Sequence, residues 1–326
     1  MKTRTLGNTG FKISEVGLGC WQLGGDFGPI DNSAIDGIFA AALDAGINFF
    51  DTADVYGDGA SERFVGEHLS KTSPKPLIAT KYGRGGGSYP DGYSLTDLRD
   101  SLKRAQDRLQ TDSIDLIQLH CIPTEVMQRG EIFDWLRTVQ QEKHIRFFGA
   151  SVETVEEALI CAEQDDLSSL QVIFNIFRQK LVDELLPLAD EKDIGIIARL
   201  PLASGLLSGK FSAGTEFDKC DHRNFNKDGA AFNVGETFAG IPFEKGVQLA
   251  ASIKAMTPEG YTTAQMAMRW ILDHPAVTTI IPGASRPEQV LENAKVSELE
   301  TLPQSLHDEL REFYQKEVAI HIRGVY

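Results

Sequence analysis

Short apolar segments alternate with amphipathic ones through most of the chain. Eight segments are almost continuously apolar, which is typical of strands buried on both faces of a sheet. They lie at 16–20, 48–53, 77–81, 115–120, 147–152, 170–175, 195–200 and 277–284. Segments with helical spacing lie between them, at 33–45, 61–69, 95–109, 132–142, 155–162 and 185–191. Regular alternation of strand and helix predicts a parallel sheet, and eight such units predict one (β/α)8 barrel domain over residues 1–326.

Three further segments lie outside this repeat. Residues 3–15 alternate weakly around Gly7-Asn8-Thr9-Gly10 and predict a β-hairpin that caps the barrel floor. Residues 211–240 have no period, and a loop of that length in a compact domain is either functional or disordered. The phenylalanines in it favour a lid that packs on the barrel; they are Phe217, Phe225, Phe232 and Phe238. Residues 287–295 and a final amphipathic helix near 304–315 follow the last strand.

An open, doubly wound sheet is the alternative fold. It requires a G-x-G-x-x-G turn after the first strand. Gly17-Leu18-Gly19 is present, but Gln22 stands where the third glycine belongs. The glycine-rich segment 84–88 does not lead directly into a helix, so the barrel is the preferred interpretation.

Charge and cysteine content narrow the function classes. The chain has 32 Lys and Arg against 47 Asp and Glu, a formal net charge of −15. Such an acidic surface argues against nucleic acid or an anionic membrane as the partner. The cysteines at 20, 121, 161 and 220 have neither metal-ligand nor disulfide-framework spacing. We therefore expect a cytoplasmic protein without a metal site; its oligomeric state stays open.

Four reactive side chains follow three consecutive predicted strands. Asp51 ends the second strand and Tyr56 lies five residues later, whereas Lys81 ends the third strand and His120 ends the fourth. In a (β/α)8 barrel the carboxyl ends of the strands meet at one mouth. We therefore expect these four side chains to lie close together.

This set of groups suits proton donation to a carbonyl oxygen. An ammonium beside a phenol lowers the phenol's pKa, and Asp51 can hold Lys81 charged and in place. His120 can orient the carbonyl while Tyr56 donates the proton, which is typically worth ~10²–10⁴ in rate. Reduction also needs a hydride, which no side chain supplies, so a nicotinamide cofactor is implied.

These residues resemble the aldo-keto reductase family over nearly the whole chain. The matching motifs are Leu6–Gly10, Gly17–Trp21, Asp51–Tyr56, Ala79–Lys81, Asp115–His120 and Ile281–Val290. The resemblance implies a (β/α)8 barrel that binds an extended NAD(P)H at its C-terminal mouth. It also implies that Asp51, Tyr56, Lys81 and His120 form the catalytic tetrad, with the tyrosine as general acid.

The resemblance further implies a set of cofactor-binding residues. Ser151 and Gln171 would contact the nicotinamide, and the segment from Pro201 through Leu202 and Ser204 to Lys210 would bind the pyrophosphate. The adenosine end would lie at Gly283, Ser285, Arg286, Gln289 and Asn293, which favours NADPH, with NADH as the other possible cofactor.

The chain departs from the family pattern at three of these positions. Val152 replaces an asparagine, and Arg199 stands where an aromatic residue commonly stacks on the nicotinamide. The basic residue near the 2′-phosphate is Arg286 instead of the position occupied by Ser285. Arg199 is thus either a stacking group, a substrate-binding group or the partner of a nearby carboxylate.

The predicted substrate is a small to medium aldehyde or ketone that contacts Trp21, Tyr56 and His120. Arg84 and Arg223 are candidates for contact with an anionic substrate group. Two alternatives remain: a redox-sensing, cofactor-binding protein with little turnover, and an aldolase that forms a Schiff base on Lys81.

Overall fold

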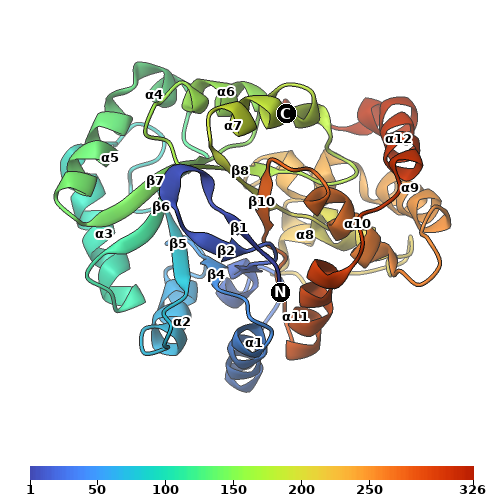
Figure 1. Cartoon of the computed structure of the whole chain (residues 1–326), viewed down its shortest axis with the longest axis horizontal. Coiled ribbons are helices and arrows are strands. Elements are labelled where there is room, and N and C mark those ends of the chain that lie inside the picture. The colour runs from blue at the N-terminus through green and yellow to red at the C-terminus, as the bar shows by residue number, and fades with distance from the viewer.

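Eight parallel strands follow one another around a barrel in the order of the sequence. The computed structural model describes residues 1–326. The strands are β3 (Leu18–Gly19), β4 (Phe49–Asp51), β5 (Leu77–Tyr82), β6 (Ile114–His120), β7 (Ile145–Ser151), β8 (Ser169–Ile173), β9 (Gly195–Arg199) and β10 (Val277–Ile280). Parallel bridges from Val16 to Ile280 and from Gly19 to Gly283 join the first strand to the last. The predicted (β/α)8 barrel is confirmed (Figure 1).

Helices surround this barrel. They are α1 (Asn32–Asp44), α2 (Ala60–Leu69), α3 (Leu95–Leu109), α4 (Thr124–Arg129), α5 (Glu131–Gln141), α6 (Val155–Ala162), α7 (Leu185–Glu191), α8 (His222–Phe225), α9 (Phe243–Ala255), α10 (Thr263–Leu272), α11 (Pro287–Ala294) and α12 (Gln304–Phe313). Figure 1 shows them around the rim of the molecule. None of them is both long enough and apolar enough to cross a membrane.

Helices α4, α9 and α10 are absent from the sequence prediction. Eight of the ten residues of α10 are buried. Its apolar side chains therefore point in all directions and give no one-sided period. The buried face of α9 includes Gly246 and Ala250, whose small side chains contribute little to a hydrophobic pattern. The other difference is in length: the first and last strands are shorter than their apolar segments.

A hairpin closes one end of the barrel, as predicted. Strand β1 (Thr3–Thr5) pairs antiparallel with β2 (Lys12–Ser14). The hairpin, dark blue in Figure 1, lies across the end that faces the viewer. Leu6 and Ile13 of this hairpin segment pack with barrel side chains in a small separate core, which we call the floor; its residues are Leu6, Ile13, Phe49, Ala79, Leu116, Ile197 and Ile281.

The side chains that face the barrel interior can be followed along each strand from the floor to the opposite end. Because every second side chain of a strand faces the same way, Phe49 at the floor places Asp51 one layer higher in the interior. Ala79 places Lys81 in the same manner. On β6, Leu116 is followed by Gln118 and then His120. The predicted reactive residues therefore project into the barrel beyond the floor.

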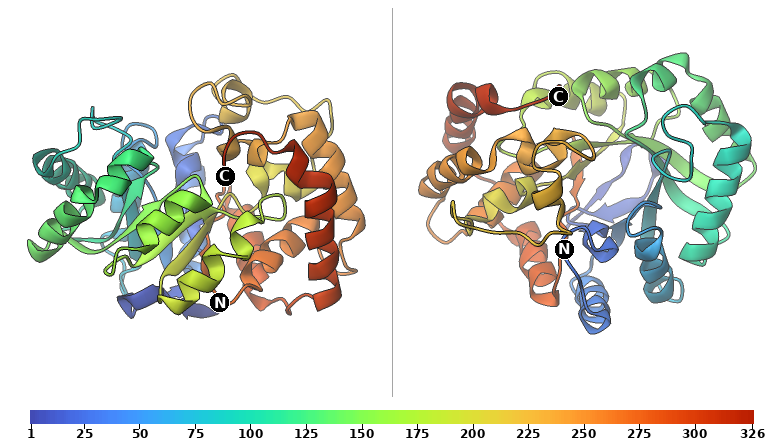
Figure 2. Two further views of the ribbon diagram at one scale, coloured as in Figure 1. Left: turned by 90° about the horizontal axis from the view of Figure 1, so that it is seen from above. Right: turned by 180° about the vertical axis from the view of Figure 1, so that it is seen from behind.

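The segment 211–240, which we call the lid, is ordered and covers that opposite end. It contains α8 and two short 3-10 turns. Figure 2 (right) shows the lid, yellow to gold, on the end away from the hairpin. Phe217 and Phe238 pack on Phe243 of α9, with ring centroids 5.4 and 4.9 Å away. His222 lies between Trp21 and Phe27, at 4.6 and 4.5 Å. The aromatic residues thus anchor the lid, as their presence in the sequence predicts.

Candidate active site

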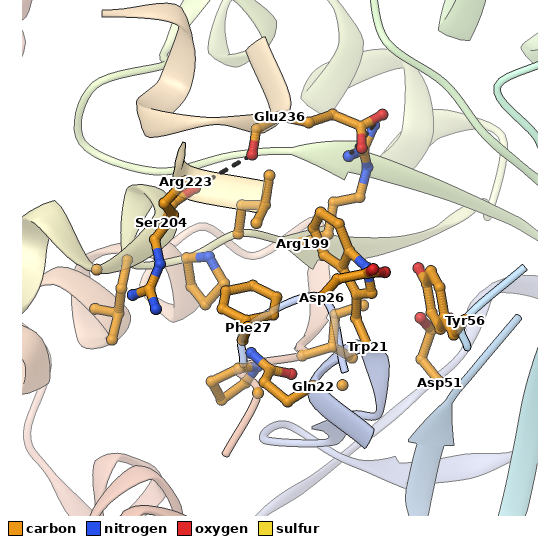
Figure 3. Close-up of a pocket in the computed structure, with 18 of the residues that line it drawn as sticks. Trp21, Gln22, Asp26, Phe27, Asp51, Tyr56, Arg199, Ser204, Arg223 and Glu236 are labelled. Carbon is orange, nitrogen blue, oxygen red and sulfur yellow. Dashed lines mark hydrogen bonds and ion pairs between the residues drawn. The ribbon is translucent and has the colours of Figure 1, made fainter. Parts of the chain in front are cut away.

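A cavity of about 720 Å³ lies between the strand ends and the lid. In Figure 3, Asp51 and Tyr56 lie together on one side of it. Arg199 and Glu236 come from another side, and Trp21 and Gln22 form part of the wall. Asp51, Tyr56 and His120 line this cavity, whereas Lys81 lies behind them, fully buried.

Lys81 is the centre of the reactive group. Its Nζ donates to Asp51 Oδ1 at 2.6 Å, to the Thr52 carbonyl at 2.8 Å and to the Tyr56 hydroxyl at 3.2 Å. Burial lowers the pKa of Lys81, but Asp51 and Tyr56 together raise it by more, so the amine stays an ammonium. All three of its donors are thus engaged.

The Tyr56 hydroxyl accepts its hydrogen bond from Lys81 and makes no other hydrogen bond. Its own proton is therefore free to point into the cavity. The net pKa shift differs from the expectation. Burial raises the pKa of Tyr56. Lys81 lowers it, as predicted, but offsets only part of that rise, so that the net pKa is about 12. The phenol is therefore protonated at neutral pH and is not an unusually strong acid in the free protein.

His120 is held in its neutral form. Burial lowers its pKa well below the ordinary value, and the positive charges of Arg84, Lys81 and Arg199 lower it further. Its ring lies edge-on to that of Tyr56, with centroids 6.0 Å apart. Its Nδ1 is buried and has no partner within the chain. A neutral imidazole that lines the cavity can hydrogen-bond a bound oxygen without adding charge.

Two glutamines donate hydrogen bonds to the carboxylate oxygen of Asp51 that does not contact Lys81. The side-chain amides of Gln171 and Gln118 both donate to Asp51 Oδ2, at 2.7 and 3.0 Å. Gln171 thus has a partner that the family resemblance did not suggest, and Gln118 is a supporting residue that the sequence analysis missed. The strand period contains a signal for it, because Gln118 lies two residues before His120 and faces the same way.

Trp21 forms the predicted apolar wall. Its ring stacks on Tyr56 at 5.9 Å, and its indole N–H donates to Asp26 at 2.7 Å. Asp26 and Phe27 also line the cavity, and the Asp26 carbonyl accepts from the His222 amide at 2.8 Å. This short loop therefore connects the wall of the cavity to the lid.

Most of the predicted cofactor residues lie along the same cavity. Those that line it are Ser151, Gln171, Arg199, Pro201, Leu202, Ser204, Lys210, Gly283, Ser285 and Gln289. Arg286 and Asn293 do not line it: Arg286 is exposed and lies 3.9 Å from Glu288, and Asn293 lies in the second half of α11.

Several of these residues already have partners in the chain. The Ser204 hydroxyl donates to the Glu236 carbonyl at 3.2 Å and accepts from the Phe238 amide at 3.1 Å (Figure 3). Gln289 Oε1 accepts from the Ser285 amide at 2.7 Å at the start of α11. Arg199 lies 3.6 Å from Glu236 and donates to the Val152 carbonyl at 3.1 Å. Of the three roles considered for Arg199, the structure therefore shows one, the pairing with a nearby carboxylate.

The cavity fits an extended dinucleotide. Its lining includes Tyr56 and His120, then Ser204 and Lys210 after β9, and Ser285 and Gln289 after β10. Lys210 supplies positive charge midway, where a pyrophosphate needs it, and α11 begins next to Ser285, where its N-terminus favours an anion. The buried Oε1 of Gln22 lines the cavity without a hydrogen-bond partner. It is thus free to accept one from a bound molecule.

Sequence reasoning missed two carboxylates at the mouth, Glu153 and Glu236. Arg84 Nη2 lies 2.9 Å from Glu153, and Arg84 Nη1 lies 3.2 Å from Glu236. Glu236 comes from the unperiodic lid, so no local pattern points to it. Arg223, a candidate for contact with a substrate anion, instead pairs with Asp221 of the lid.

The fold and these side chains define a (β/α)8-barrel protein with a cluster of titratable side chains at its mouth. The model of the Aldo/keto reductase family matches residues 15–315. The chain therefore belongs to the aldo/keto reductase family, as the sequence motifs predict, and is an oxidoreductase.

Individual relatives agree over nearly their full length. The chain is 30% identical over 303 residues to an uncharacterized oxidoreductase, YqkF, of Bacillus subtilis, with 91% of each chain covered. The glycerol dehydrogenase AKR11B4 from Gluconobacter oxydans superimposes with a TM-score of 0.77 and 28% identity, over 99% of this chain and 98% of that one. The holo form of aldo-keto reductase AKR11C1 from Bacillus halodurans gives 0.78 and 25%, over 100% and 98%.

Proposed function

We propose that the protein reduces aldehydes or ketones to alcohols with NADPH. One observation carries this proposal: Lys81 donates to the Tyr56 hydroxyl from behind, so that the phenolic proton is available to the cavity. A reduced nicotinamide supplies the hydride when it is bound.

The side chains of this chain supply the proton and the orientation. His120 hydrogen-bonds the substrate's carbonyl oxygen and aims it at Tyr56. Tyr56 gives its proton to that oxygen as negative charge develops there. The ammonium of Lys81 stabilises the tyrosinate that remains, and Asp51 keeps Lys81 charged and correctly placed. Trp21 forms the apolar wall against which the substrate packs.

The residues along the cavity would hold the cofactor in an extended form. Ser151 and Gln171 lie nearest to the tetrad and are assigned to the nicotinamide carboxamide. Pro201, Leu202, Ser204 and Lys210 are assigned to the pyrophosphate. At the adenosine end we assign Gly283, Ser285, Arg286, Gln289 and Asn293, and the cationic Arg286 favours NADPH over NADH. Arg286 must turn away from Glu288 to reach a 2′-phosphate.

The alternative of Schiff-base chemistry on Lys81 is not favoured. A nucleophilic lysine must be neutral and accessible. Lys81 is only 1% exposed, and its ammonium donates to three oxygens. The alternative of a cofactor-binding sensor with little turnover shares the same site, and kinetics separate it from a reductase.

We test the proposal by measuring cofactor binding and turnover separately. Fluorescence titrations with NADPH and NADH should show tighter binding of NADPH, and a panel of aldehydes and ketones should oxidise NADPH. The Tyr56→Phe variant should bind NADPH as the wild type does but lose roughly 10²–10⁴ in kcat/KM. Binding without turnover on the whole panel would contradict a reductase and support a sensor. Equal affinity for the two cofactors would contradict the role assigned to Arg286.

A further inference from the structure

Two arginines and two carboxylates meet beside the tetrad. Arg84 lies between β5 and α3, Glu153 follows β7, Arg199 ends β9, and Glu236 comes from the lid. All four side chains line the cavity. We call these residues the mouth cluster.

Glu236 occupies a position built for an anion. Its Oε1 lies 3.2 Å from Arg84 Nη1 and 3.6 Å from Arg199 Nη1. The residue is 4% exposed. Burial raises the pKa of its carboxyl, but the two guanidinium groups outweigh that effect and lower it, so the group is a carboxylate. The arginines thus bind a carboxylate, and the chain itself provides it.

The anion position lies next to the reacting groups. Arg199 Nη2 is 3.6 Å from Sγ of Cys121, the residue after His120, and Glu236 Oε1 is 4.0 Å from the same sulfur. Arg199 Nε is buried without a partner. A carboxylate on a substrate whose carbonyl faces Tyr56 would therefore meet Arg84, Arg199 and the charge of Glu236 together.

The charge balance of the mouth cluster makes such a substrate unfavourable. Among the charged side chains that line this part of the cavity, Arg84 and Arg199 are balanced by Glu153 and Glu236. A third arginine, Arg178, lies next to them but does not line the cavity: it is 3% exposed, and its Nη2 donates to the Glu153 carbonyl at 3.3 Å. Cys121, Glu153 and Glu236 come close enough to ligate a metal ion, but the arginines already supply the balancing positive charge. A third carboxylate would have either to sit beside two negative charges or to displace Glu236 from both of its arginines.

We propose that Glu236 is a specificity-determining residue: its carboxylate fills the anion position between Arg84 and Arg199, so that the site accepts uncharged carbonyl compounds and rejects those that carry a carboxylate. This inference rests on the proposed reductase function and names the substrate class of the same site. Removal of the charge at this position should leave the two arginines with positive charge that a substrate carboxylate can balance.

The lid should survive that change. The backbone of Glu236 is held independently of its side chain, by the Ser204 hydroxyl at 3.2 Å and by the Asn233 carbonyl at 3.0 Å. Asn233 also donates to Glu153 at 2.9 Å. The Glu236→Gln variant keeps the shape of the side chain and an oxygen that the arginines can contact. It therefore removes the charge and little else.

A matched pair of substrates isolates the charge. 4-Carboxybenzaldehyde and its methyl ester differ at the para position and have the same reacting aldehyde. The wild type should prefer the ester, and in Glu236→Gln the ratio of the two kcat/KM values should shift toward the carboxylate by roughly tenfold or more, the worth of a charge-assisted hydrogen bond. Glu236→Asp should keep the wild-type preference, since it keeps the charge.

Two further variants test the mechanism of that shift. Glu216→Gln removes a charge from an exposed position of the same lid and should leave the ratio unchanged. The double variant Glu236→Gln with Arg84→Gln should lose the gain for the carboxylate. An unchanged ratio in Glu236→Gln, or an equal shift in Glu216→Gln, would overturn the proposal.

A binding measurement distinguishes this proposal from the reductase proposal. Calorimetry with benzoate, which cannot be reduced at an aldehyde, should detect roughly tenfold or more tighter binding to Glu236→Gln than to the wild type. Equal benzoate binding by the two proteins overturns the anion site even if both reduce aldehydes. Lack of turnover with either aldehyde, together with the binding difference, contradicts the reductase but supports the anion site.

Discussion

The floor and the mouth of the barrel are built on the same strands but differ in their interior side chains, which are apolar at the floor and polar at the mouth. At the floor, interior positions hold apolar side chains, and the hairpin seals them from water. Toward the mouth, later interior positions of the same strands hold Asp51, Lys81 and His120, at or just behind the cavity wall. Two residues on β4 and β5, and four on β6, thus separate an apolar packing position from a polar one at the cavity.

Buried charges occur at both ends, but they are arranged differently. At the floor, Arg269 bridges Glu15 and Asp273, at 3.6 and 2.8 Å, and Arg4 pairs with Glu15 at 3.0 Å. Asp273 also contacts Nε2 of His307 at 3.1 Å, and none of these groups lines the cavity. At the mouth, the Tyr56 proton and His120 Nδ1 remain free of partners in the chain. Glu15 Oε1 also lacks a hydrogen-bond partner, but it does not line the cavity, whereas Tyr56 and His120 do.

The largest effect is expected from removal of the charge behind Tyr56. In Lys81→Met, Asp51 becomes a buried carboxylate without its cation, which should cost about 3–5 kcal/mol of stability. The same change should lower kcat/KM by at least the roughly 10²–10⁴ associated with a positioned acid. Urea unfolding and aldehyde turnover measure the two effects.

The double variant Lys81→Met with Asp51→Asn sharpens this result. It should regain much of the stability, because no unpaired charge is left, but none of the activity. A single variant as stable as the wild type would show that Asp51 and Lys81 are not a charged pair.

A smaller effect, confined to stability, is expected at the floor. Leu6 is fully buried between the hairpin and the strands, so Leu6→Ala should cost about 2–5 kcal/mol of unfolding free energy. At temperatures where the variant is folded, kcat/KM should not change. Lys103→Ala, at an exposed pair with Asp107, is the control and should stay within about 0.5 kcal/mol. A loss of kcat/KM in folded Leu6→Ala would contradict the separation of the two ends.

The smallest effect is expected from the histidine in the lid. Burial lowers the pKa of His222 to about 4, Arg223 also lowers it, and Asp221 raises it only in part. Because the folded pKa lies below the ordinary value of 6.5, the packed lid is favoured above pH 6.5. It loses that advantage as the pH falls toward 4, and at pH 5 the loss is about 2 kcal/mol.

Limited proteolysis of the lid between pH 7.5 and 4.5 measures this effect. The wild type should become more susceptible as the pH falls, and His222→Gln, which does not titrate, should change less. The same pH dependence in both proteins would assign the effect to other groups.

The sequence predicts the proximity of Asp51, Tyr56, Lys81 and His120 well because parallel strand ends must converge. Each of these residues lies at or just after an apolar segment, so topology alone brings Asp51, Lys81 and His120 together. The same reasoning could have predicted Gln118, because it lies two residues before His120 on one strand and therefore points to the same side. The barrel itself follows from eight repeated units for the same reason.

Other features depend on contacts that no local pattern encodes. Glu236 meets Arg84 across a sequence separation of 152 residues, and the lid that carries it has no period. The net pKa shift of Tyr56 depends on its burial in the folded chain, which outweighs the visible charge of Lys81. Helix α10 escaped prediction because burial on nearly every side erases the one-sided pattern of a surface helix.

The closure of the barrel has a consequence for the order of folding. The first and last strands are joined by isolated bridges between the segments around Val16 and Ile280, which are far apart in the chain. Contacts at long sequence separation form slowly, since a large loop must close before they are made. The neighbouring strands β4, β5 and β6 pair with much shorter intervals between them. The strands that supply Asp51, Lys81 and His120 can therefore assemble early, before the seam of the barrel closes.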